Sequence, residues 1–434
     1  MTELTITSLA FGGDGVGRLP DGRTVFVAGT CPGDRVRVAL AEEHPRWTRA
    51  RLEDVIEPSL DRVVPPCPYA GVCGGCQWQH IAYPQQLEAK RQSVIDALTR
   101  IGGVADETLV SACRTSSPEL GYRNKVELVA DLRSNRLSLG YHRLGSTDVV
   151  PVDRCLLLPK ALEDAPRKLQ GTLRYLAGRS DLAVARVALR VATHTKDIEV
   201  ALWQAPGPAP RAAFASTLGA TLPITSLVRV LFKGPLKERH ISRVEVLAGR
   251  GFWREELGDH RFAVSAPSFF QVNTLAAETL VEIALEALDP DGSDRVLDIY
   301  AGVGTFTLPL AEVAGEVAAV ESSGSAVRDL RRNLEGARLS ADVLPGDAAR
   351  VLDEVGPADL VLVDPPRTGL ARGIVRALVA ARPRRIVYVS CDPATLARDA
   401  RSLTESGFRL VAAHPVDLFP QSFHVETVAC FDRL

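Results

Sequence analysis

The strongest constraint on the fold is the alternation of helical and strand-like segments from about Ala263 to the C-terminus. Apolar residues at helical spacing predict a helix over Leu275–Leu288, and short apolar runs follow it at intervals that leave room for further helices. This rhythm predicts an α/β fold with a doubly wound, mainly parallel sheet, in which ligands bind at the carboxyl ends of the strands. The four predicted strands are Arg295–Asp298, Val317–Val320, Leu360–Val363 and Ile386–Val389.

The first 57 residues follow a different pattern, in which short alternating stretches such as Thr24–Val27 are separated by Gly-rich turns such as Gly12-Gly13-Asp14-Gly15. This pattern predicts a small OB-like β-barrel. Residues 58–262 begin with an irregular stretch rich in Cys, Gly and Pro, continue with a helix over Gln85–Ile101, and then contain strand-like runs from Lys125 to Gly251. Alternation in those runs predicts an antiparallel sheet with one wet face. We therefore expect three domains, over residues 1–57, 58–262 and 263–434.

Composition excludes some classes of protein and leaves others open. A formal net charge of −2 means that any nucleic-acid site must be a local patch. Neither a signal peptide nor a run of 18 apolar residues is present, so we expect a cytoplasmic protein without a membrane partner. Disulfides are rare in that compartment, and clustered cysteines among the eight in the chain therefore indicate metal binding or catalysis.

A glycine-containing loop follows the first predicted strand, with the sequence Asp298-Ile299-Tyr300-Ala301-Gly302-Val303-Gly304-Thr305-Phe306. Thr307 replaces the third glycine of the dinucleotide fingerprint. An acidic residue before such a turn instead suits a cofactor with an amino acid and a ribose but no pyrophosphate. Glu321, at the end of the next strand, is placed to accept hydrogen bonds from ribose hydroxyls, and Asp347 could reach an adenine amino group. The alternative is a dinucleotide-binding or purely structural loop.

Cys391 ends the last predicted strand, within Val389-Ser390-Cys391-Asp392-Pro393. Asp392 can cap the following helix and Pro393 suits its first turn. A thiol at the positive end of a helix dipole is favoured as thiolate, so Cys391 is a candidate nucleophile. The alternative is a buried structural cysteine.

Two further segments carry candidate catalytic groups. Glu426 starts a strand, where partial burial would raise its pKa toward that of a useful base. Asp364-Pro365-Pro366-Arg367 forms a stiff turn from which Arg367 could hold a base carbonyl or a phosphate. Their alternatives are a structural glutamate at a strand edge and a rigid connector. We assign no role to His424.

Cys67, Cys73 and Cys76 form a C-x5-C-x2-C motif, for which Cys155 or its rival Cys113 could supply a fourth thiolate. Four thiolates suit zinc or an iron–sulfur cluster. The asymmetric spacing favours iron–sulfur slightly, and free structural thiols are the alternative. We expect Cys31 and Cys430 to be core residues.

In combination these motifs resemble the RNA 5-methyluridine methyltransferases. The segments that carry the resemblance are Ser390-Cys391-Asp392-Pro393-Ala394-Thr395, Asp364-Pro365-Pro366-Arg367, Gln421-Ser422-Phe423-His424-Val425-Glu426 and Phe269-Phe270-Gln271-Val272-Asn273. The cysteine motif and an N-terminal barrel that resembles the TRAM type extend the likeness over the whole chain. It implies a Rossmann-like S-adenosylmethionine-dependent methyltransferase domain preceded by a TRAM barrel and a mixed α+β central domain.

The resemblance also implies roles for individual residues. Cys391 would add to C6 of a uracil, C5 would take the methyl group, and Glu426 would remove the C5 proton. S-adenosylmethionine would contact Gln271, Tyr300, Thr305, Glu321, Asp347 and Asp364, although the family often has Asn where Thr305 stands. A [4Fe–4S] cluster would lie on Cys67, Cys73, Cys76 and Cys155.

The resemblance favours 23S ribosomal RNA as substrate over transfer RNA, with no obligate protein partner inferred. Two other functions remain open from the residues alone. Asp-Pro-Pro motifs also serve methylation at nitrogen, which would leave Cys391 and Glu426 without a role. Alternatively, the chain could be an iron–sulfur RNA-binding protein without turnover. The modified uridine and the oligomeric state are not encoded in any motif that we find.

Overall fold

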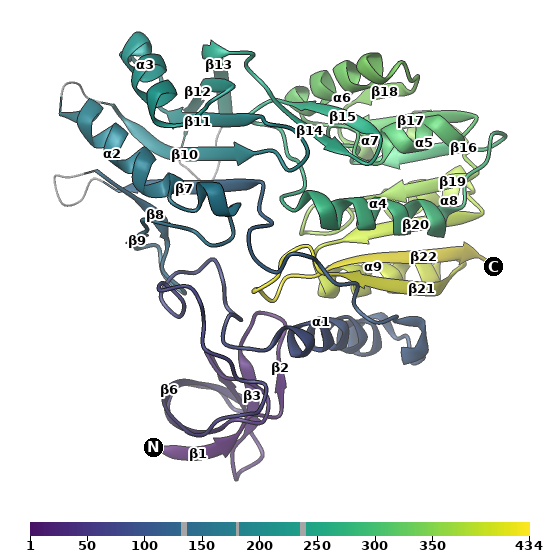
Figure 1. Ribbon diagram of the computed structural model, residues 1–434. Helices are drawn as coiled ribbons and strands as arrows, with labels where there is room; N and C mark the ends of the chain where they lie inside the picture. Colours follow the sequence, from purple (N-terminus) through teal and green to yellow (C-terminus); the bar gives the residue numbers. More distant parts are fainter. Residues whose placement is uncertain (132–136, 179–181, 235–239) are drawn as a thin grey trace.

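The computed structural model describes residues 1–131, 137–178, 182–234 and 240–434, which form three large sheets with their covering helices and one two-stranded hairpin. Figure 1 places the N-terminal sheet at the bottom, the central sheet at the upper left and the C-terminal sheet on the right. None of the helices in the described residues has the length and apolar character needed to cross a membrane.

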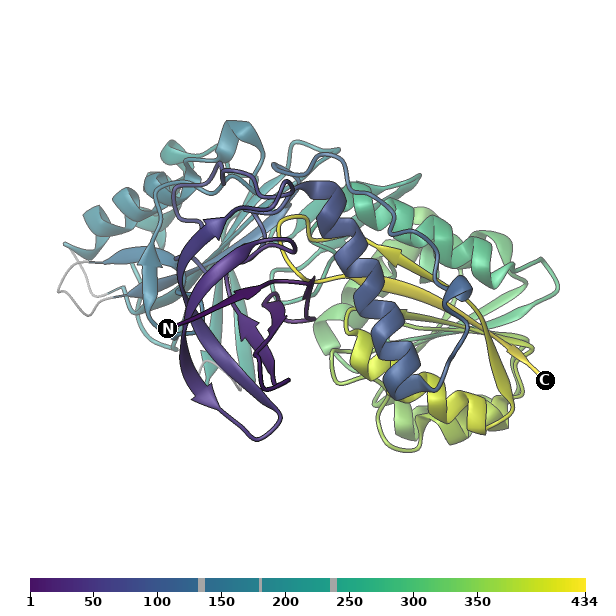
Figure 2. The ribbon, with the colours of Figure 1, turned by 90° about the horizontal axis from the view of Figure 1, so that it is seen from below.

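The N-terminal sheet is strongly curved (Figure 2) and has six strands in the order β1-β5-β6-β4-β3-β2. Alternate residues such as Val25 and Val27 point inward and are fully buried, which gives the barrel its own small apolar core. Its strands are β1 (Thr2–Thr5), β2 (Ser8–Leu9), β3 (Gly15–Arg18), β4 (Thr24–Val27), β5 (Arg35–Glu43) and β6 (Trp47–Glu57).

The central sheet has seven strands in the order β13-β12-β11-β10-β7-β8-β9, and helices α2 (Ala165–Ala177) and α3 (Arg211–Thr221) accompany it. The prediction of a fully antiparallel sheet is wrong at one point, because β11 and β12 are parallel, with α3 between them in the chain. The predicted wet face is also wrong for these two strands: seven of the eight residues of β12 and all of β11 are buried. The strands are β7 (Lys125–Asp131), β8 (Ser138–His142), β9 (Val149–Pro151), β10 (Val184–Val191), β11 (Ile198–Gln204), β12 (Ser226–Lys233) and β13 (His240–Gly249).

A two-stranded hairpin, β14 (Trp253–Leu257) and β15 (His260–Val264), leads into the C-terminal sheet. That sheet has the order β18-β17-β16-β19-β20-β22-β21, with parallel pairing from β18 to β20 and antiparallel pairing of β22 to both neighbours. The prediction of a mainly parallel sheet is therefore confirmed. Runs such as Leu360–Val363 are buried on both faces, as a sheet covered by helices requires.

The strands of the C-terminal sheet are β16 (Arg295–Ile299), β17 (Glu316–Glu321), β18 (Asp342–Pro345), β19 (Leu360–Val363), β20 (Arg385–Ser390), β21 (Phe408–Val416) and β22 (Glu426–Arg433). Its helices are α4 (Thr274–Leu288), α5 (Thr307–Val313), α6 (Gly324–Ala337), α7 (Ala348–Val355), α8 (Ile374–Ala381) and α9 (Pro393–Glu405).

Helix α1 (Tyr83–Ala97) comes before the central sheet in the chain but packs on the C-terminal one. Its residues Val94 and Ile95 share a core cluster with residues of α9 and β21. A π-type turn, Leu98–Gly102, continues the helix and buries Leu98 in the same core. Helix α1 therefore joins the cysteine-rich segment before it to the C-terminal sheet.

Candidate active site

Cys391 and Glu426 lie near each other at the carboxyl end of β20. Ser390, the last residue of β20, pairs with Thr427 of antiparallel β22. Extended by one residue, this register sets Cys391 opposite Glu426, and the Glu426 carboxyl group is close enough to raise the pKa of the Cys391 thiol. Opposite residues of an antiparallel pair lie on the same face, so the extended register and the electrostatics agree.

The turn around Cys391 forms as its sequence predicts. Asp392 caps α9, because its Oδ1 accepts hydrogen bonds of 2.9 Å from the backbone N–H groups of both Ala394 and Thr395, and Pro393 opens the helix. The prediction that the helix end favours the thiolate is wrong, however. Burial raises the pKa of the thiol to about 12, and the neighbouring Glu426 and Asp364 add to the effect, against the opposing influence of Arg367.

Glu426 is only 4% exposed, which is deeper than the sequence predicts. Burial raises its pKa well above the ordinary value, Asp364 raises it further, and the Arg367 guanidinium opposes both. The predicted raised pKa is confirmed. Arg367 lies close enough to influence both the thiol and this carboxyl group.

Two further acidic residues, Asp298 and Asp364, lie near Cys391 and Glu426 at the ends of the parallel strands. Asp364 follows β19 directly, and Asp298 lies in the neighbouring β16, fully buried. Burial raises the pKa of each to about 7, and the charge of Asp298 contributes to the shift at Asp364. We call Asp298, Asp364, Cys391 and Glu426 the strand-end cluster.

Asp298 has one satisfied and one unsatisfied oxygen. Its Oδ2 accepts a hydrogen bond of 2.5 Å from Thr307 Oγ1, whereas its buried Oδ1 has no partner in the described part of the chain. An unpaired buried carboxylate oxygen is costly. A ligand with a hydrogen-bond donor would satisfy it.

The loop after β16 has the backbone geometry of a ligand-binding turn. Tyr300 and Gly302 both have left-handed backbones, with φ of 68° and 59°. Such a conformation is costly for tyrosine and is common at binding sites. Gly304 has φ of 100°, and a Cβ there would lie 2.6 Å from Leu308, so only glycine fits.

Glu321, at the end of β17, braces this loop. Its Oε2 accepts a hydrogen bond of 2.9 Å from the Gly302 backbone N–H, and its Oε1 accepts one of 2.6 Å from Ser323 N–H. The carboxylate is therefore held in place at the carboxyl end of β17.

The remaining predicted cofactor residues are spread around the same edge. Gln271 is buried, and its backbone carbonyl accepts a hydrogen bond of 2.8 Å from Asn124 Nδ2. Thr305 is half-buried in the loop itself. Asp347 caps α7 by accepting from the Ala349 N–H at 3.0 Å, and the Gly346 N–H donates to the Glu321 carbonyl.

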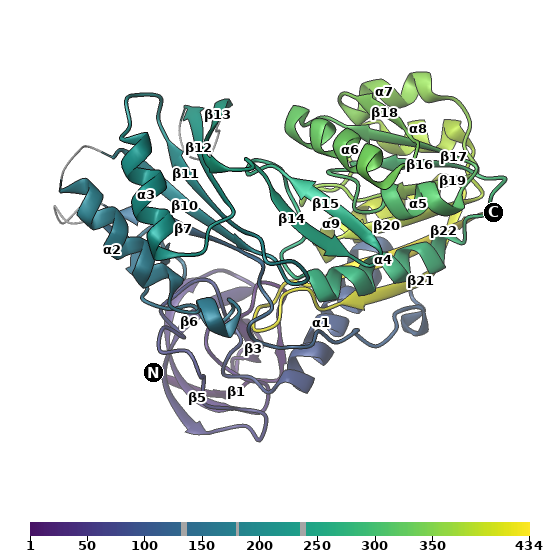
Figure 3. The same cartoon turned by 45° about the horizontal axis from the view of Figure 1, so that its top comes forward.

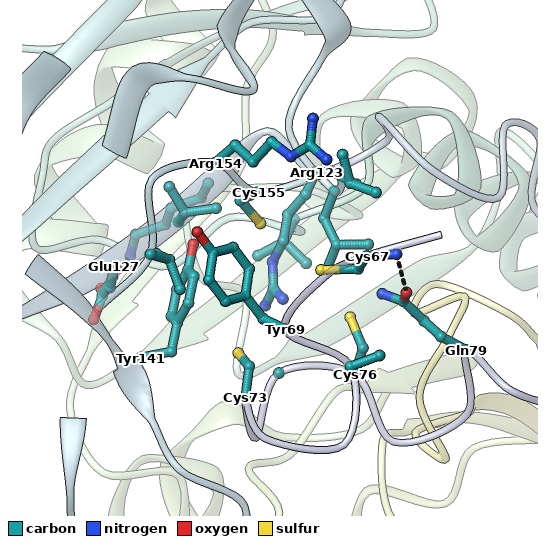
Figure 4. A pocket seen from close by; sticks show the side chains of 18 residues that line it. Cys67, Tyr69, Cys73, Cys76, Gln79, Arg123, Glu127, Tyr141, Arg154 and Cys155 are labelled. Atoms are coloured by element: carbon teal, nitrogen blue, oxygen red, sulfur yellow. Dashed lines mark hydrogen bonds and ion pairs between the residues drawn. The ribbon is translucent and has the colours of Figure 1, made fainter. Parts of the chain in front are cut away.

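A second site, distant in sequence, is a cavity of about 340 Å³ at the edge of the central sheet (Figure 4). Cys67, Cys73, Cys76 and Cys155 all line it, and Figure 4 shows their sulfur atoms around the same space. We call it the cysteine cavity. Cys113, the alternative to Cys155 as fourth thiolate, does not line this cavity. It is buried in the core under the C-terminal sheet. Cys31 and Cys430 are buried core residues, as predicted.

The four cysteines share one cavity, but their side chains are not grouped as a metal site. Around one zinc with tetrahedral bonds of 2.3 Å, the sulfurs would lie about 3.8 Å apart. Among the described residues, no three His, Cys, Asp or Glu side chains are grouped closely enough to hold a metal ion. Four thiolates are the donor set of a zinc site or of an iron–sulfur cluster.

A groove of about 1530 Å³ runs between the barrel, the cysteine-rich segment and the end of α1. It reaches Ala394, three residues beyond Cys391, and the rings of Phe11, Phe26 and Trp47 line it. Guanidinium groups together with aromatic rings suit a polyanion with stackable bases. The arginines that line it are Arg18, Arg46, Arg49, Arg62 and Arg100.

The sequence reasoning missed a polar network beneath the loop that ends at Glu426. Lys90, fully buried in α1, donates to Asp417 Oδ1 at 2.5 Å and to the Phe419 carbonyl at 3.0 Å. A signal was available: Lys90 lies three residues after Leu87 and four before Val94, on the apolar face of the predicted helix. A lysine on such a face needs a buried partner.

Comparisons with known proteins agree with this geometry. The sequence model of the family described as tRNA (Uracil-5-)-methyltransferase matches residues 352–433, the TRAM domain model matches residues 2–52, and the methyltransferase small domain model matches residues 266–387. An RNA methyltransferase of Thermosynechococcus vestitus is 36% identical over 98% of this chain and 97% of its own. A second, from Synechocystis sp., is 36% identical over 98% of this chain and 94% of its own.

Among solved structures, the tRNA (uracil-54, C5)-methyltransferase of Pyrococcus abyssi in complex with S-adenosyl-L-homocysteine superposes with a TM-score of 0.77 at 27% identity. The match covers 99% of this chain and 100% of that one. The likeness therefore includes the barrel and the central sheet as well as the C-terminal sheet.

Proposed function

This chain belongs to the family of RNA (uracil-5-)-methyltransferases, with S-adenosylmethionine as methyl donor, and we propose that it methylates C5 of a uridine through a covalent adduct with Cys391. The observation that carries the mechanism is the proximity of Cys391 and Glu426, which adjoin the last residue pair of β20 and β22, so that the carboxyl group raises the pKa of the thiol. Methylation at nitrogen would need neither residue, and it leaves this pairing unexplained.

Cys391 is the proposed nucleophile. Its Sγ, as thiolate, forms a bond to C6 of the uracil, and the electrons of the C5–C6 double bond move toward O4, which makes C5 nucleophilic. The raised pKa of the free thiol means that binding must favour the ionised form. Arg367, whose charge lowers the pKa of this thiol, is the protein group placed to do so and to hold the uracil carbonyl.

Glu426 is the proposed general base. S-adenosylmethionine, when bound, supplies the methyl group as an electrophile at C5. The Glu426 carboxylate then takes the C5 proton, the C5–C6 double bond re-forms, and the C6–S bond breaks to release Cys391. A raised pKa suits this role, because a more basic carboxylate accepts a proton from carbon more readily.

The proposed cofactor residues are Gln271, Tyr300, Thr305, Glu321, Asp347 and Asp364. Three features of the edge support a ligand there: the unpaired Oδ1 of Asp298, the left-handed backbone of Tyr300, and the braced carboxylate of Glu321. Asp347 has no such feature, because its side chain already caps α7. Its role toward adenine rests on its proximity to Glu321.

A [4Fe–4S] cluster on Cys67, Cys73, Cys76 and Cys155 is the proposed occupant of the cysteine cavity. The four thiols that line one cavity, together with the asymmetric spacing of the C-x5-C-x2-C motif, support this choice. The strand-end chemistry moves no net electrons, so these cysteines act in shaping the surface around the groove. We also propose the domain division 1–57, 58–262 and 263–434, with α1 docked on the last of these.

Ribosomal RNA, in particular 23S RNA, is the proposed substrate, on the resemblance of the barrel and the cysteine motif to ribosomal members of the family. Transfer RNA is the second candidate, because the solved neighbour that covers 99% of this chain acts on tRNA. In folded RNA the target uridine would have to leave its stack to reach Cys391.

The test is mass spectrometry of nucleosides from ribosomal and transfer RNA of cells with and without the gene. Loss of 5-methyluridine from a ribosomal fragment supports the proposal in full. Loss of 5-methyluridine from transfer RNA instead supports the proposed mechanism and makes transfer RNA the substrate. Unchanged 5-methyluridine in both RNAs, in cells without a second such enzyme, overturns the proposed function.

A further inference from the structure

The loop of residues 417–425 connects β21 to β22 and ends directly at Glu426. In Figures 1 and 3 this yellow loop reaches away from the C-terminal sheet toward the other two sheets. Its position decides where the carboxyl group of Glu426 lies. The groups that fix the loop come from other elements of the chain.

Gln86 of α1 makes two contacts with Gln421, at the middle of this loop. Its Oε1 accepts a hydrogen bond of 3.0 Å from the Gln421 backbone N–H, and its Nε2 lies 3.1 Å from Gln421 Oε1. The same Nε2 donates to the carbonyls of Trp78 and Ile81 at 3.1 and 2.9 Å. Gln86 is 1% exposed. Its amide therefore holds both the backbone and the side chain of Gln421.

Gln421 has a conformation that requires such support. Its φ of 72° lies in the left-handed region, which is uncommon for a residue other than glycine. The Trp78 backbone N–H donates to the Gln421 carbonyl at 3.0 Å. Conformations of this kind persist only where the surroundings determine them, and they occur preferentially at functional sites.

The first half of the loop has its own anchor. Lys90 binds Asp417 and the Phe419 carbonyl, Tyr83 donates to Asp417 Oδ2 at 3.0 Å, and Asn273 donates to the Leu418 carbonyl at 3.2 Å. These contacts end before Gln421. From Gln421 onward the loop is held by the Gln86 amide, by the Trp78 backbone N–H and by the packing of Phe423 and Val425, and not by the buried ion pair. Among these groups, Gln86 is the side chain that hydrogen-bonds Gln421.

We propose that Gln86 is a positioning residue for Glu426: its bidentate contact with Gln421 fixes the loop so that the carboxyl group faces C5 of the adduct. This inference rests on the proposed function, in which Glu426 removes the C5 proton. Gln86 touches neither the thiol nor the acidic residues of the strand-end cluster. Its loss should therefore slow proton removal and spare the addition of Cys391.

The test separates these two steps with two versions of one RNA. Transcripts of ribosomal and transfer RNA are made with uridine or with 5-fluorouridine. With fluorine at C5 no proton can be removed, so the covalent adduct persists after methyl transfer and reports only the steps before Glu426 acts. With uridine, formation of free 5-methyluridine requires all the steps. Both rates are measured on full-length protein with radiolabelled S-adenosylmethionine.

For Gln86→Met, we expect adduct formation with 5-fluorouridine RNA within about twofold of the unsubstituted protein. We expect release of 5-methyluridine to fall by about tenfold or more, because small displacements of catalytic groups have effects of this size. Methylated covalent adduct should accumulate on uridine RNA. Gln92, exposed on the same helix, provides the matched control, and Gln92→Met should leave both rates unchanged.

A parallel fall of both rates in Gln86→Met, or no change in either, overturns the inference. Gln86→Glu keeps the shape and the acceptor oxygen, and it is used if thermal melting shows that Gln86→Met does not fold. It should give the same separation of the two rates, and a parallel fall there also overturns the inference. Absence of any adduct with the unsubstituted protein would instead contradict the proposed function.

Discussion

The strand-end cluster and the cysteine cavity place four chemical groups each, but the backbone determines their positions in different ways. Regular strands position the first site: Cys391 directly follows β20, Glu426 is the first residue of the paired β22, and Asp364 follows a parallel strand. The cysteine cavity draws three of its thiols from an irregular segment between Cys67 and Cys76, and the fourth, Cys155, from a loop far along the chain.

This difference separates two ways of building a site. A sheet holds its strand-end groups in place whether or not a ligand is bound, because the backbone hydrogen bonds do that work. Irregular loops have few such bonds, and the sulfurs of the cysteine cavity are not grouped for a metal ion in the described chain. We therefore expect the first site to be preorganised and the second to take its final geometry from the group that it binds.

The largest effect should follow from Cys391→Ala. Without the thiol no adduct forms at C6, and C5 stays a poor nucleophile. We expect methyl transfer to fall by about 10⁴-fold or more, as for other catalytic nucleophiles. Transfer of radiolabel to RNA measures it. Cys430→Ala, which removes a buried core thiol on β22, serves as the control and should keep most of the activity. Equal losses in the two variants would remove the distinction between catalytic and core thiols.

Glu426→Gln should have the next largest effect. Glutamine keeps the shape but takes no proton, so turnover should fall by about 10²- to 10⁴-fold while the methylated adduct accumulates. Denaturing gel electrophoresis of protein with RNA detects that adduct. A variant that loses turnover and traps nothing would contradict the role of Glu426 as base.

A smaller effect on activity is expected in the cysteine cavity, with a clear change in metal content. Cys155→Ser should lose most of the bound iron and sulfide and about tenfold in activity, since disturbing a metal centre or its support costs 10- to 100-fold in metal affinity or activity. Cys113→Ser should keep both, because Cys113 lies outside the cavity. Elemental analysis of the purified variants measures the bound iron, sulfide and zinc. Zinc in place of iron would overturn the cluster assignment.

The comparison also explains what the sequence could predict. The spacing of apolar residues and the composition of the short apolar runs predicted the four parallel strands. Buried apolar runs that alternate with helices are compatible with few other folds. Residues at strand ends then had to meet at one edge, which is why Asp298, Asp364 and Cys391 lie together. For the central sheet, alternation predicted antiparallel pairing, but it could not reveal that the α3 connection makes β11 and β12 parallel.

Tertiary effects were less accessible. The pKa of Cys391 depends on burial and on Glu426 and Asp364, which approach only in the folded chain, so the local helix argument gave the wrong sign. Gln86 and Gln421 are more than 300 positions apart, and the Gln86 amide has no local signature. In contrast, the placement of Lys90 on an apolar helical face was a readable signal of a buried partner.

The last prediction concerns pH and has the smallest expected effect. Asp298 and Asp364 have pKa values raised to about 7, so lowering the pH from 8 to 6 protonates both. S-adenosylmethionine carries a positive sulfonium that S-adenosylhomocysteine lacks. Its affinity should therefore fall by about threefold to tenfold relative to the homocysteine compound over that range. Titration calorimetry with both ligands measures the ratio. In Asp298→Asn, the ratio of the two affinities should depend less on pH.

Folding stability should change in the opposite direction, which makes this prediction a strict test. A carboxyl group with a raised pKa in the folded state contributes stability that is fully present below the unfolded value of about 4. That contribution is lost as the pH rises through about 7. The melting temperature of the protein alone should therefore fall from pH 5 to pH 8 through these groups, while stabilisation by S-adenosylmethionine grows. If Asp298→Asn removes neither trend, the strand-end carboxyl groups are not the charges that recognise the cofactor.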